Sequence, residues 1–302
     1  MDVLKITNLT KTYNKKAVID HLNMTVEKGD IYGFVGKNGA GKTTLMRLVL
    51  SLAKGDEGEI SLFESDNLLK ESERVGSLIE TPALYKSATA YENIRRYSVL
   101  YGADEKKIPE ILEFIGLDNT GRKKVSMFSL GMKQRLGIGI ALIRDPEFLI
   151  LDEPINGLDP EGISDIRNLL IKLNKERNVT ILISSHLLDE LSKIASKVGI
   201  ISNGRLVCET TYEEIKKECR RSLHVAVDDV EKAKETLNAF LPDRFVSVSD
   251  NELIISKDDD NENENALINK ELVSKGIMVN GLYEEGYSLE EYYLKKVGGS
   301  IE

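Results

Sequence analysis

The sequence predicts an α/β protein with a mainly parallel core sheet, followed by a smaller α+β unit. Short β-branched runs alternate with amphipathic helical stretches through residues 1–210 of the 302-residue chain, which is typical of parallel strands joined by crossover helices. Several expected strands, such as residues 180–184, are apolar at nearly every position, as strands covered on both faces require. The remaining residues differ in order of elements and in charge, so we expect them to fold as a second unit.

The first unit is expected to contain six strands and six helices. Runs rich in β-branched and other apolar residues predict strands at 3–9, 17–26 in pieces, 31–35, 148–151, 179–184 and 197–202. Apolar residues spaced three or four apart predict helices at 43–52, 90–101, 107–115, 130–143, 160–176 and 187–195.

The second unit has a different order of expected elements. Strands at 223–227, 245–249, 253–256 and 277–282 are interrupted by helices at 230–240 and 266–275, and a helix at 289–297 follows. The order β-α-β-β-α-β is that of a ferredoxin-like split unit. We therefore expect an accessory domain at 211–302, after a first domain at 1–210.

The distribution of charge also separates the two units. The chain has 41 Lys and Arg against 50 Asp and Glu, a formal net charge of −9. Residues 1–210 hold 29 of each sign, so all the excess acidity lies in 211–302. This balance argues against a general nucleic-acid binder, which needs a basic face to offset phosphate. It does not exclude a local phosphate site in the neutral first unit.

Membrane and redox features are absent from the sequence pattern. No window reaches the roughly 18 apolar residues of a membrane span, and Met1 is followed by Asp2 and Lys5 rather than by a basic and then apolar leader. Cys208 and Cys219 have no metal-ligand spacing and are expected to be thiols in a reducing compartment. We therefore expect a cytoplasmic chain that does not cross a bilayer itself.

The clearest functional motif is a glycine-rich run between the expected strand 31–35 and the expected helix 43–52. It fits G-x-x-x-x-G-K-[ST] and comprises Gly36, Lys37, Asn38, Gly39, Ala40, Gly41, Lys42 and Thr43, with Thr44 next. Glycines let the backbone wrap phosphates, and amides at the helix N-terminus supply positive potential. Lys42 is expected to reach the β/γ-phosphates and Thr43 to bind Mg²⁺, which predicts a P-loop NTPase fold with ATP and Mg²⁺ as cofactors.

Two carboxylates follow the apolar strand 148–151. Asp152 and Glu153 stand at the end of that strand, where a parallel sheet also carries its P-loop. We expect Asp152 to hold the Mg²⁺ shell and Glu153 to orient or deprotonate an attacking water. A strand that merely ends in acids is the alternative, and the P-loop disfavours it.

A third motif lies between these two and carries a family resemblance. The run F-S-L-G-M-K-Q-R at 128–135 is similar to the signature motif of ABC transporter ATP-binding subunits, usually Leu-Ser-Gly-Gly-Gln. Ser129 and Gly131 keep the hydroxyl and the close-approach amide, aimed in this family at the γ-phosphate of a second subunit's ATP. Leu130 and Met132 depart from the usual Gly and Gln.

Three more positions match the same family in order. Tyr13 resembles the aromatic residue that stacks on adenine, Asp159 lies in a run similar to the D-loop that crosses to the partner subunit, and His186 matches the switch histidine that touches the γ-phosphate. An aromatic residue in a strand is otherwise ordinary packing, and an isolated histidine is otherwise a surface or core residue. The ordered matches across 13–186 identify the first unit as a member of the family.

One position departs from the family pattern in an informative way. Glu80 stands where the family usually has the glutamine of the Q-loop, and a carboxylate there implies a catalytic or metal-binding role near Mg²⁺. Together with Leu130 and the run S-L-E-E-Y-Y at 288–293, it resembles the subgroup that serves bacitracin efflux and lantibiotic immunity. The alternative is that Glu80 is a tolerated surface substitution.

The resemblance implies a dimeric ATPase that powers a transporter. Each ATP would lie between the P-loop of one copy and the signature motif of the second copy, and hydrolysis would drive separate transmembrane permease subunits. The chain would be peripheral at the cytoplasmic face of the cell membrane, with membrane contact through the permease only and no nucleic acid as partner. The expected cargo is a peptide antibiotic.

Two alternatives to this function remain. One is an exporter ATPase of the same family for another cargo, such as ions or lipids. The other is a soluble P-loop ATPase that remodels nucleic acid or ribosomes, which would be expected to show two ATPase units, long coiled-coil or zinc inserts, or a basic surface. The sequence shows none of these.

Overall fold

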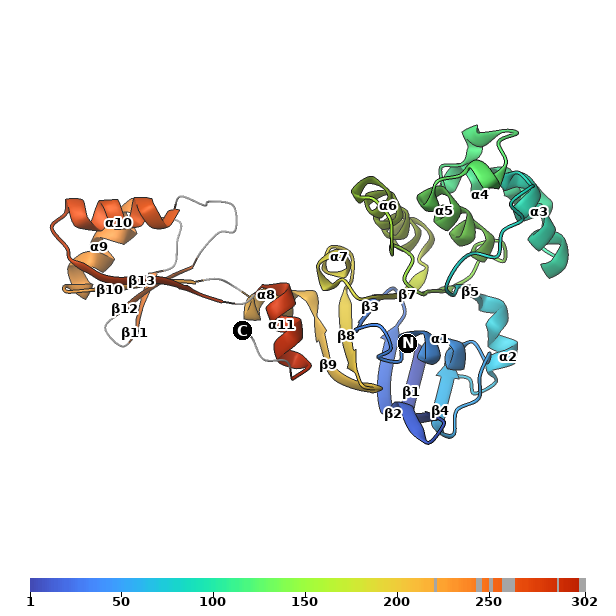
Figure 1. Cartoon of the computed structure of the whole chain (residues 1–302), viewed down its shortest axis with the longest axis horizontal. Coiled ribbons are helices and arrows are strands. Elements are labelled where there is room, and N and C mark those ends of the chain that lie inside the picture. The colour runs from blue at the N-terminus through green and yellow to red at the C-terminus, as the bar shows by residue number, and fades with distance from the viewer. Residues whose placement is uncertain (220–221, 243–245, 250–251, 257–263, 287, 299–302) are drawn as a thin grey trace. The chain divides into compact units, whose positions relative to one another are not determined.

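The computed structural model describes residues 1–219, 222–242, 246–249, 252–256, 264–286 and 288–298. It divides into two compact units, one over Met1–Tyr212 with Lys296–Gly298 and the other over Glu213–Lys295 (Figure 1). Among the described residues, no helix combines the length and the apolar character that spanning a bilayer takes.

A six-stranded sheet forms the centre of the first unit. Its order is β5 (Val75–Leu78), β6 (Phe148–Leu151), β7 (Thr180–Ser185), β3 (Ile31–Val35), β8 (Lys197–Ser202) and β9 (Arg205–Thr211). The first five strands are parallel and β9 is antiparallel at the edge. All residues of β3, β6 and β7 are buried, which confirms a mainly parallel core sheet with both faces covered.

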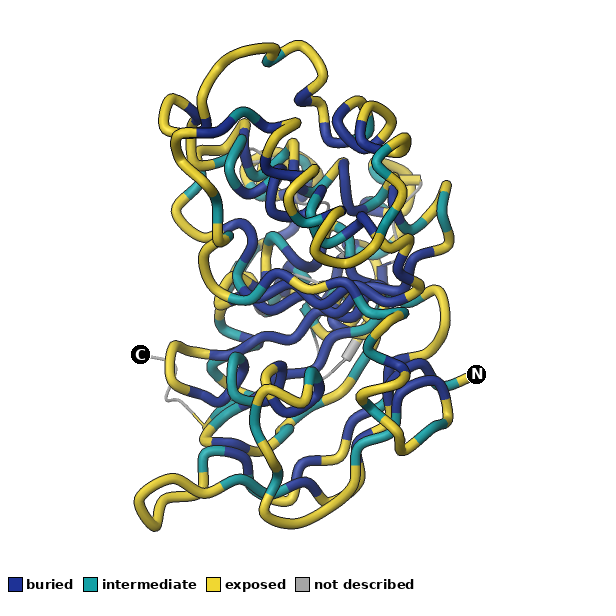
Figure 2. The backbone as a smooth tube through the Cα atoms, turned by 90° about the vertical axis from the view of Figure 1, so that its right-hand side faces the viewer, coloured by how far each residue is buried: buried dark blue, intermediate teal, exposed yellow. Residues whose placement is uncertain are grey.

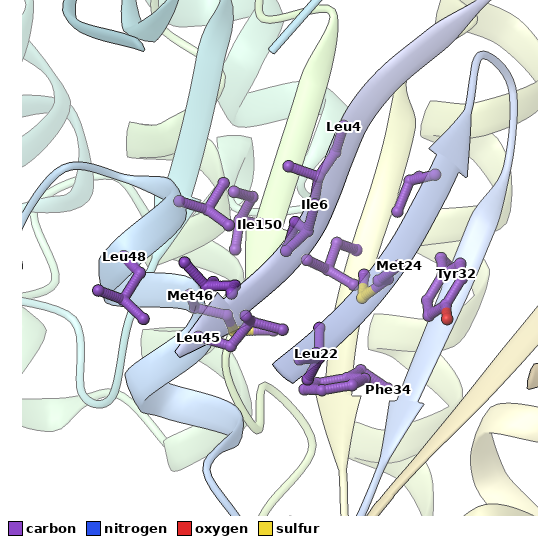
Figure 3. Close-up of a cluster of buried hydrophobic side chains, with 14 of the residues drawn as sticks. Leu4, Ile6, Leu22, Met24, Tyr32, Phe34, Leu45, Met46, Leu48 and Ile150 are labelled. Carbon is purple, nitrogen blue, oxygen red and sulfur yellow. The ribbon is translucent and has the colours of Figure 1, made fainter. Parts of the chain in front are cut away.

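A second, antiparallel sheet packs over the helix that follows β3. It consists of β2 (Lys16–Glu27), β1 (Asp2–Tyr13) and β4 (Glu57–Leu62) in that order. Helix α1 (Lys42–Val49) inserts its apolar side chains into a core made with β1, β2, β3 and β6; Leu45, Met46 and Leu48 are among them (Figure 3). This burial fixes the start of α1 relative to the central sheet.

Four longer helices complete the first unit. They are α3 (Ala90–Tyr101), α4 (Ile108–Phe114), α5 (Leu130–Ala141) and α6 (Pro160–Arg177), with short helices α2 (Leu68–Glu71) and α7 (Leu188–Ser192). Single 3-10 turns lie at Ser72–Arg74, Glu105–Lys107, Asp118–Thr120 and Val125–Met127. Buried backbone gathers inside this unit and exposed loops form its outside (Figure 2).

The second unit has the predicted β-α-β-β-α-β order. Its elements are α8 (Tyr212–Glu218), β10 (Ser222–Val227), α9 (Val230–Phe240), β11 (Val246–Ser249), β12 (Glu252–Ser256), α10 (Glu264–Ser274), β13 (Val279–Glu285) and α11 (Leu289–Lys296). The antiparallel sheet runs β11-β12-β10-β13, the arrangement that split crossovers produce. Phe245, the expected first residue of the second strand, lies outside the described residues.

The structure also contains three strands that the sequence pattern did not predict. These are β4, β5 and β9. β4 and β9 are mostly exposed or half-buried, and β5 contains Gly76 among only four residues. Each is therefore defined by the strand it pairs with rather than by a strong apolar run of its own.

Candidate active site

The glycine-rich loop is built by close backbone packing. A Cβ on Gly36 would lie 2.6 Å from Ile201 Cγ2 and 2.7 Å from the Ile201 carbonyl, so no larger residue fits there. Gly41 begins α1 with φ +114°, a left-handed conformation that glycine adopts without strain. The Gly36 amide donates to the Ser185 carbonyl at 3.2 Å. The loop is thus held between β7 and β8.

A pocket of about 180 Å³ opens beside this loop. Its lining consists of Val18, Asn38, Gly39, Gly41, Lys42, Thr43, Thr44 and Glu153. The Lys42 side chain is 5% exposed, and its ammonium donates to the carbonyls of Gly36 and Lys37. A buried cation beside a helix N-terminus favours a phosphate ligand. Ala40 is buried, and a Cβ on Gly36 would lie 3.2 Å from the Ala40 Cβ.

Asp152 lies against the first turn of α1. The Thr43 hydroxyl donates to Asp152 Oδ2 at 2.7 Å, and the Asp152 amide donates to the Leu78 carbonyl at 2.8 Å. The carboxylate is only 3% exposed. A hydroxyl and a carboxylate oxygen this close together, next to a phosphate-binding loop, are oxygen ligands of the kind that Mg²⁺ prefers. The residues present therefore fit that ion.

Glu153 connects the P-loop lysine to the histidine after β7. Its Oε1 lies 3.0 Å from Lys42 Nζ and its Oε2 lies 3.0 Å from His186 Nδ1. Glu153 has φ +48°, an uncommon conformation for a non-glycine residue that is frequent at functional sites. The structure thus brings Lys42, Thr43, Asp152, Glu153 and His186 into one cluster.

Ser184 belongs to the same cluster, although the sequence did not single it out. Its hydroxyl donates to Asp152 Oδ1 at 2.6 Å and accepts from the Glu153 amide at 2.9 Å. The residue is fully buried in β7. A serine near the end of an otherwise apolar strand was the available signal, because a buried hydroxyl needs a partner.

The signature residues lie in a second pocket of about 470 Å³. Ser129 caps α5, its hydroxyl accepting from the Met132 amide at 3.2 Å, and Asp159 caps α6 by accepting from the Gly162 amide at 3.0 Å. Ser129, Gly131 and Asp159 all line this pocket, which shares no lining residue with the P-loop pocket. Within one chain, the P-loop residues and the signature residues therefore lie in separate pockets.

Comparisons with known proteins identify the family. The family model described as ABC transporter matches residues 19–156. The chain is 42% identical to the bacitracin transport ATP-binding protein BcrA of Bacillus licheniformis, over 98% of both chains. The chain belongs to the ABC transporter family. It is an ATP-binding subunit of that family, whose members hydrolyse ATP to power transport.

Two further relatives cover about 70% of this chain. The lantibiotic transport ATP-binding protein SrtF of Streptococcus pyogenes is 42% identical over 70% of this chain and 92% of its own length. The dimeric post-hydrolysis structure of the ATP-binding cassette MJ0796, bound to ADP and Pi, has 25% identity and a TM-score of 0.62. It covers 69% of this chain and 98% of the cassette. The P-loop and α/β fold predictions are confirmed.

Tyr13 lies at the end of β1 and outside both pockets. Its side chain is 47% exposed, and the Lys11 ammonium lies 5.2 Å from the centroid of its ring. The ring is therefore accessible for stacking, but the structure does not bring it into the lining of the P-loop pocket. The stacking of Tyr13 on the adenine of ATP therefore stays a prediction for this ABC ATPase.

Glu80 follows β5, and its predicted catalytic or metal-binding role stays a prediction. Its carboxylate forms an ion pair with Arg47 of α1, with Nη2 and Oε1 2.5 Å apart, and the side chain is 59% exposed. Its backbone has φ +59°. Within the described part of the chain, Glu80 therefore contacts the last turn of α1. The Thr43 and Asp152 oxygens contact each other instead.

Proposed function

We propose that this ABC ATPase powers the export of a peptide antibiotic of the bacitracin or lantibiotic type. The observation that carries the proposal is the 42% identity to a bacitracin transport protein over 98% of both chains. That match includes the second unit, whereas SrtF matches 70% of this chain. We propose residues 1–210 as the ATP-binding domain and 211–302 as an accessory domain of this transporter.

The proposed chemistry is hydrolysis of ATP by an attacking water. Bound Mg²⁺ would supply charge neutralisation at the phosphates, held by Thr43 and Asp152. Lys42 neutralises phosphate oxygens, Glu153 accepts the proton of the water as its oxygen bonds to the γ-phosphorus, and ADP leaves. His186, 3.0 Å from Glu153, orients that carboxylate and reaches toward the γ-phosphate.

We further propose that the working unit is a dimer. The P-loop pocket and the signature pocket are separate within one chain, and a cassette with 25% identity forms a dimer. ATP between the P-loop of one copy and Ser129, Gly131 and Asp159 of the second copy would join both pockets. Separate transmembrane permease subunits would hold the dimer peripherally at the cytoplasmic face of the membrane.

Antibiotic sensitivity of a deletion strain tests the cargo. Deletion is expected to raise sensitivity to bacitracin or to a lantibiotic, and the wild-type gene is expected to restore resistance. The Glu153→Gln gene serves as the matched control, because it should be expressed and assemble without supporting hydrolysis. Unchanged sensitivity to all these peptides, with intact ATPase activity that ions or lipids stimulate, would favour the alternative cargo class.

A further inference from the structure

We infer that Arg47 is a positioning residue for ATP hydrolysis, acting through Glu80 on the segment 79–82. Arg47 lies in the last turn of α1, the helix that the P-loop opens. Glu80 lies two residues after β5. The ion pair between them therefore links the P-loop helix to a segment far away in the sequence. The inference concerns hydrolysis itself and does not depend on the cargo.

The segment around Glu80 contacts both the backbone of Asp152 and helix α5, which carries the signature residues. The Leu78 carbonyl accepts the Asp152 amide at 2.8 Å, so the end of β5 sets the position of the buried carboxylate. Pro82 lies so close to α5 that a Cβ on Gly137 would be 2.8 Å from Pro82 Cγ. Leu78 to Pro82 therefore runs from the Asp152 backbone to the helix that Ser129 caps.

Ile79 and Glu80 are the anchors between these two contacts. Ile79 packs against the apolar core beneath α1. Glu80 has a left-handed backbone, φ +59°, which a non-glycine residue keeps only when its surroundings hold it. The Arg47 guanidinium supplies the one charged contact of Glu80 among the described residues. We infer that this contact holds the backbone of Glu80 in its left-handed conformation.

The geometry separates an effect on turnover from an effect on nucleotide binding. The P-loop is held by its own contacts, with Gly36 against Ile201 and Gly41 against the Val18 carbonyl, and none of these passes through Glu80. Asp152, in contrast, is tied to Leu78. Loss of the ion pair should therefore disturb the placement of the carboxylates while ATP affinity is retained. Misplacement of catalytic groups by a fraction of an ångström is enough to lower turnover.

A charge swap tests the inference in the purified full-length chain. Arg47→Glu and Glu80→Arg are each expected to lower kcat about tenfold, with KM for ATP within about twofold of wild type. The double variant recreates the pair in reverse and is expected to recover kcat to within about threefold of wild type. Arg47→Lys keeps the charge and should retain most of the activity. Half-saturating Mg²⁺ is measured for every variant.

A matched ion pair elsewhere on the first unit provides the control. Arg95 and Glu105 are 2.8 Å apart, with side chains 58% and 41% exposed, close to the exposure of Arg47 and Glu80. Arg95→Glu is expected to leave kcat unchanged. Exposed ion pairs contribute little to folding stability, so thermal melting should be alike for all these variants.

Two results would overturn the inference. Wild-type kcat in Arg47→Glu would show that the pair does no positioning. An inactive charge-swapped double variant with a raised Mg²⁺ requirement would show that Glu80 acts as a carboxylate at the metal, since arginine cannot replace that ligand.

If a reversed charge prevents folding, Arg47→Met and Glu80→Gln replace the single variants. Their double variant should then lose no more kcat than either one alone, and additive losses would contradict the inference.

Discussion

Replacing Ser184 by alanine should both destabilise the fold and impair catalysis. The hydroxyl is fully buried, donates to Asp152 Oδ1 at 2.6 Å and accepts from the Glu153 amide at 2.9 Å. Ser184→Ala removes both interactions at once. It leaves a buried carboxylate with one fewer donor and a backbone amide without its acceptor.

The magnitude follows from the charge of the partner. A hydrogen bond to a charged group contributes about 1.5–3 kcal/mol, and an orphaned buried donor costs about 1–3 kcal/mol. Because Asp152 keeps its bond from Thr43, we expect the free energy of unfolding to fall by about 3 kcal/mol, near the lower half of the summed range. The carboxylate should also lose orientation, which raises the Mg²⁺ concentration needed for half-maximal ATPase activity.

Urea unfolding without nucleotide, followed by circular dichroism, measures the free energy of unfolding. Ser192→Ala is the matched control, because Ser192 is 4% exposed and its hydroxyl donates to the uncharged Asp189 carbonyl at 2.7 Å. The control should lose about 1 kcal/mol and keep its Mg²⁺ requirement. Equal losses in the two variants, together with an unchanged Mg²⁺ requirement in Ser184→Ala, would contradict this prediction.

Three further predictions concern the loop, the base and the buried tyrosine. Gly36→Ala should lose ATP binding by more than about tenfold, since its Cβ would lie 2.6 Å from Ile201; nucleotide titration checks this, and wild-type affinity would contradict it. Glu153→Gln should bind ATP and dimerise but hydrolyse it about a hundredfold more slowly, measured by phosphate release; turnover like wild type would exclude Glu153 as the base. Burial and Glu209 raise the pKa of Tyr32 well above its ordinary value of 10.0, so its contribution to stability is complete below pH 10 and falls as pH rises above it. The stability gap between wild type and Tyr32→Phe should therefore narrow between pH 8 and 11 in urea unfolding, and a constant gap would contradict this.

Motifs and strands with strong local patterns were predictable from the sequence. β3, β6 and β7 are continuous apolar runs, buried at every position, and each leads directly into a predicted functional residue. The P-loop conformation depends on neighbouring glycines, and Asp152 and Glu153 follow their strand without a gap. Such features are local, so residue type and spacing are sufficient to indicate them.

Features made by pairing between distant segments were not predictable in this way. β4 and β9 have few buried residues, so their hydrogen-bonded neighbours define them. The contacts of Ser184 and Arg47 depend on β7 lying beside β6 and on α1 lying beside the end of β5, and nothing in the local sequence specifies those neighbours. The expected metal role of Glu80 follows from its position in a motif and stays a prediction, whereas its ion pair with Arg47 could be found only in the structure.

The sequence predicts an ATPase of the ABC type, because its P-loop, signature run and carboxylates resemble those of the family in type and order. It also determined the β-α-β-β-α-β order of the second unit, since those elements carry their own periodicity. The folded structure is needed to show which side chains share a pocket, which hydroxyl supports Asp152 and which cation pairs with Glu80. These contacts follow from sheet order and close packing, which bring together distant residues such as Ser184 and Asp152, 32 positions apart, and Arg47 and Glu80, 33 positions apart.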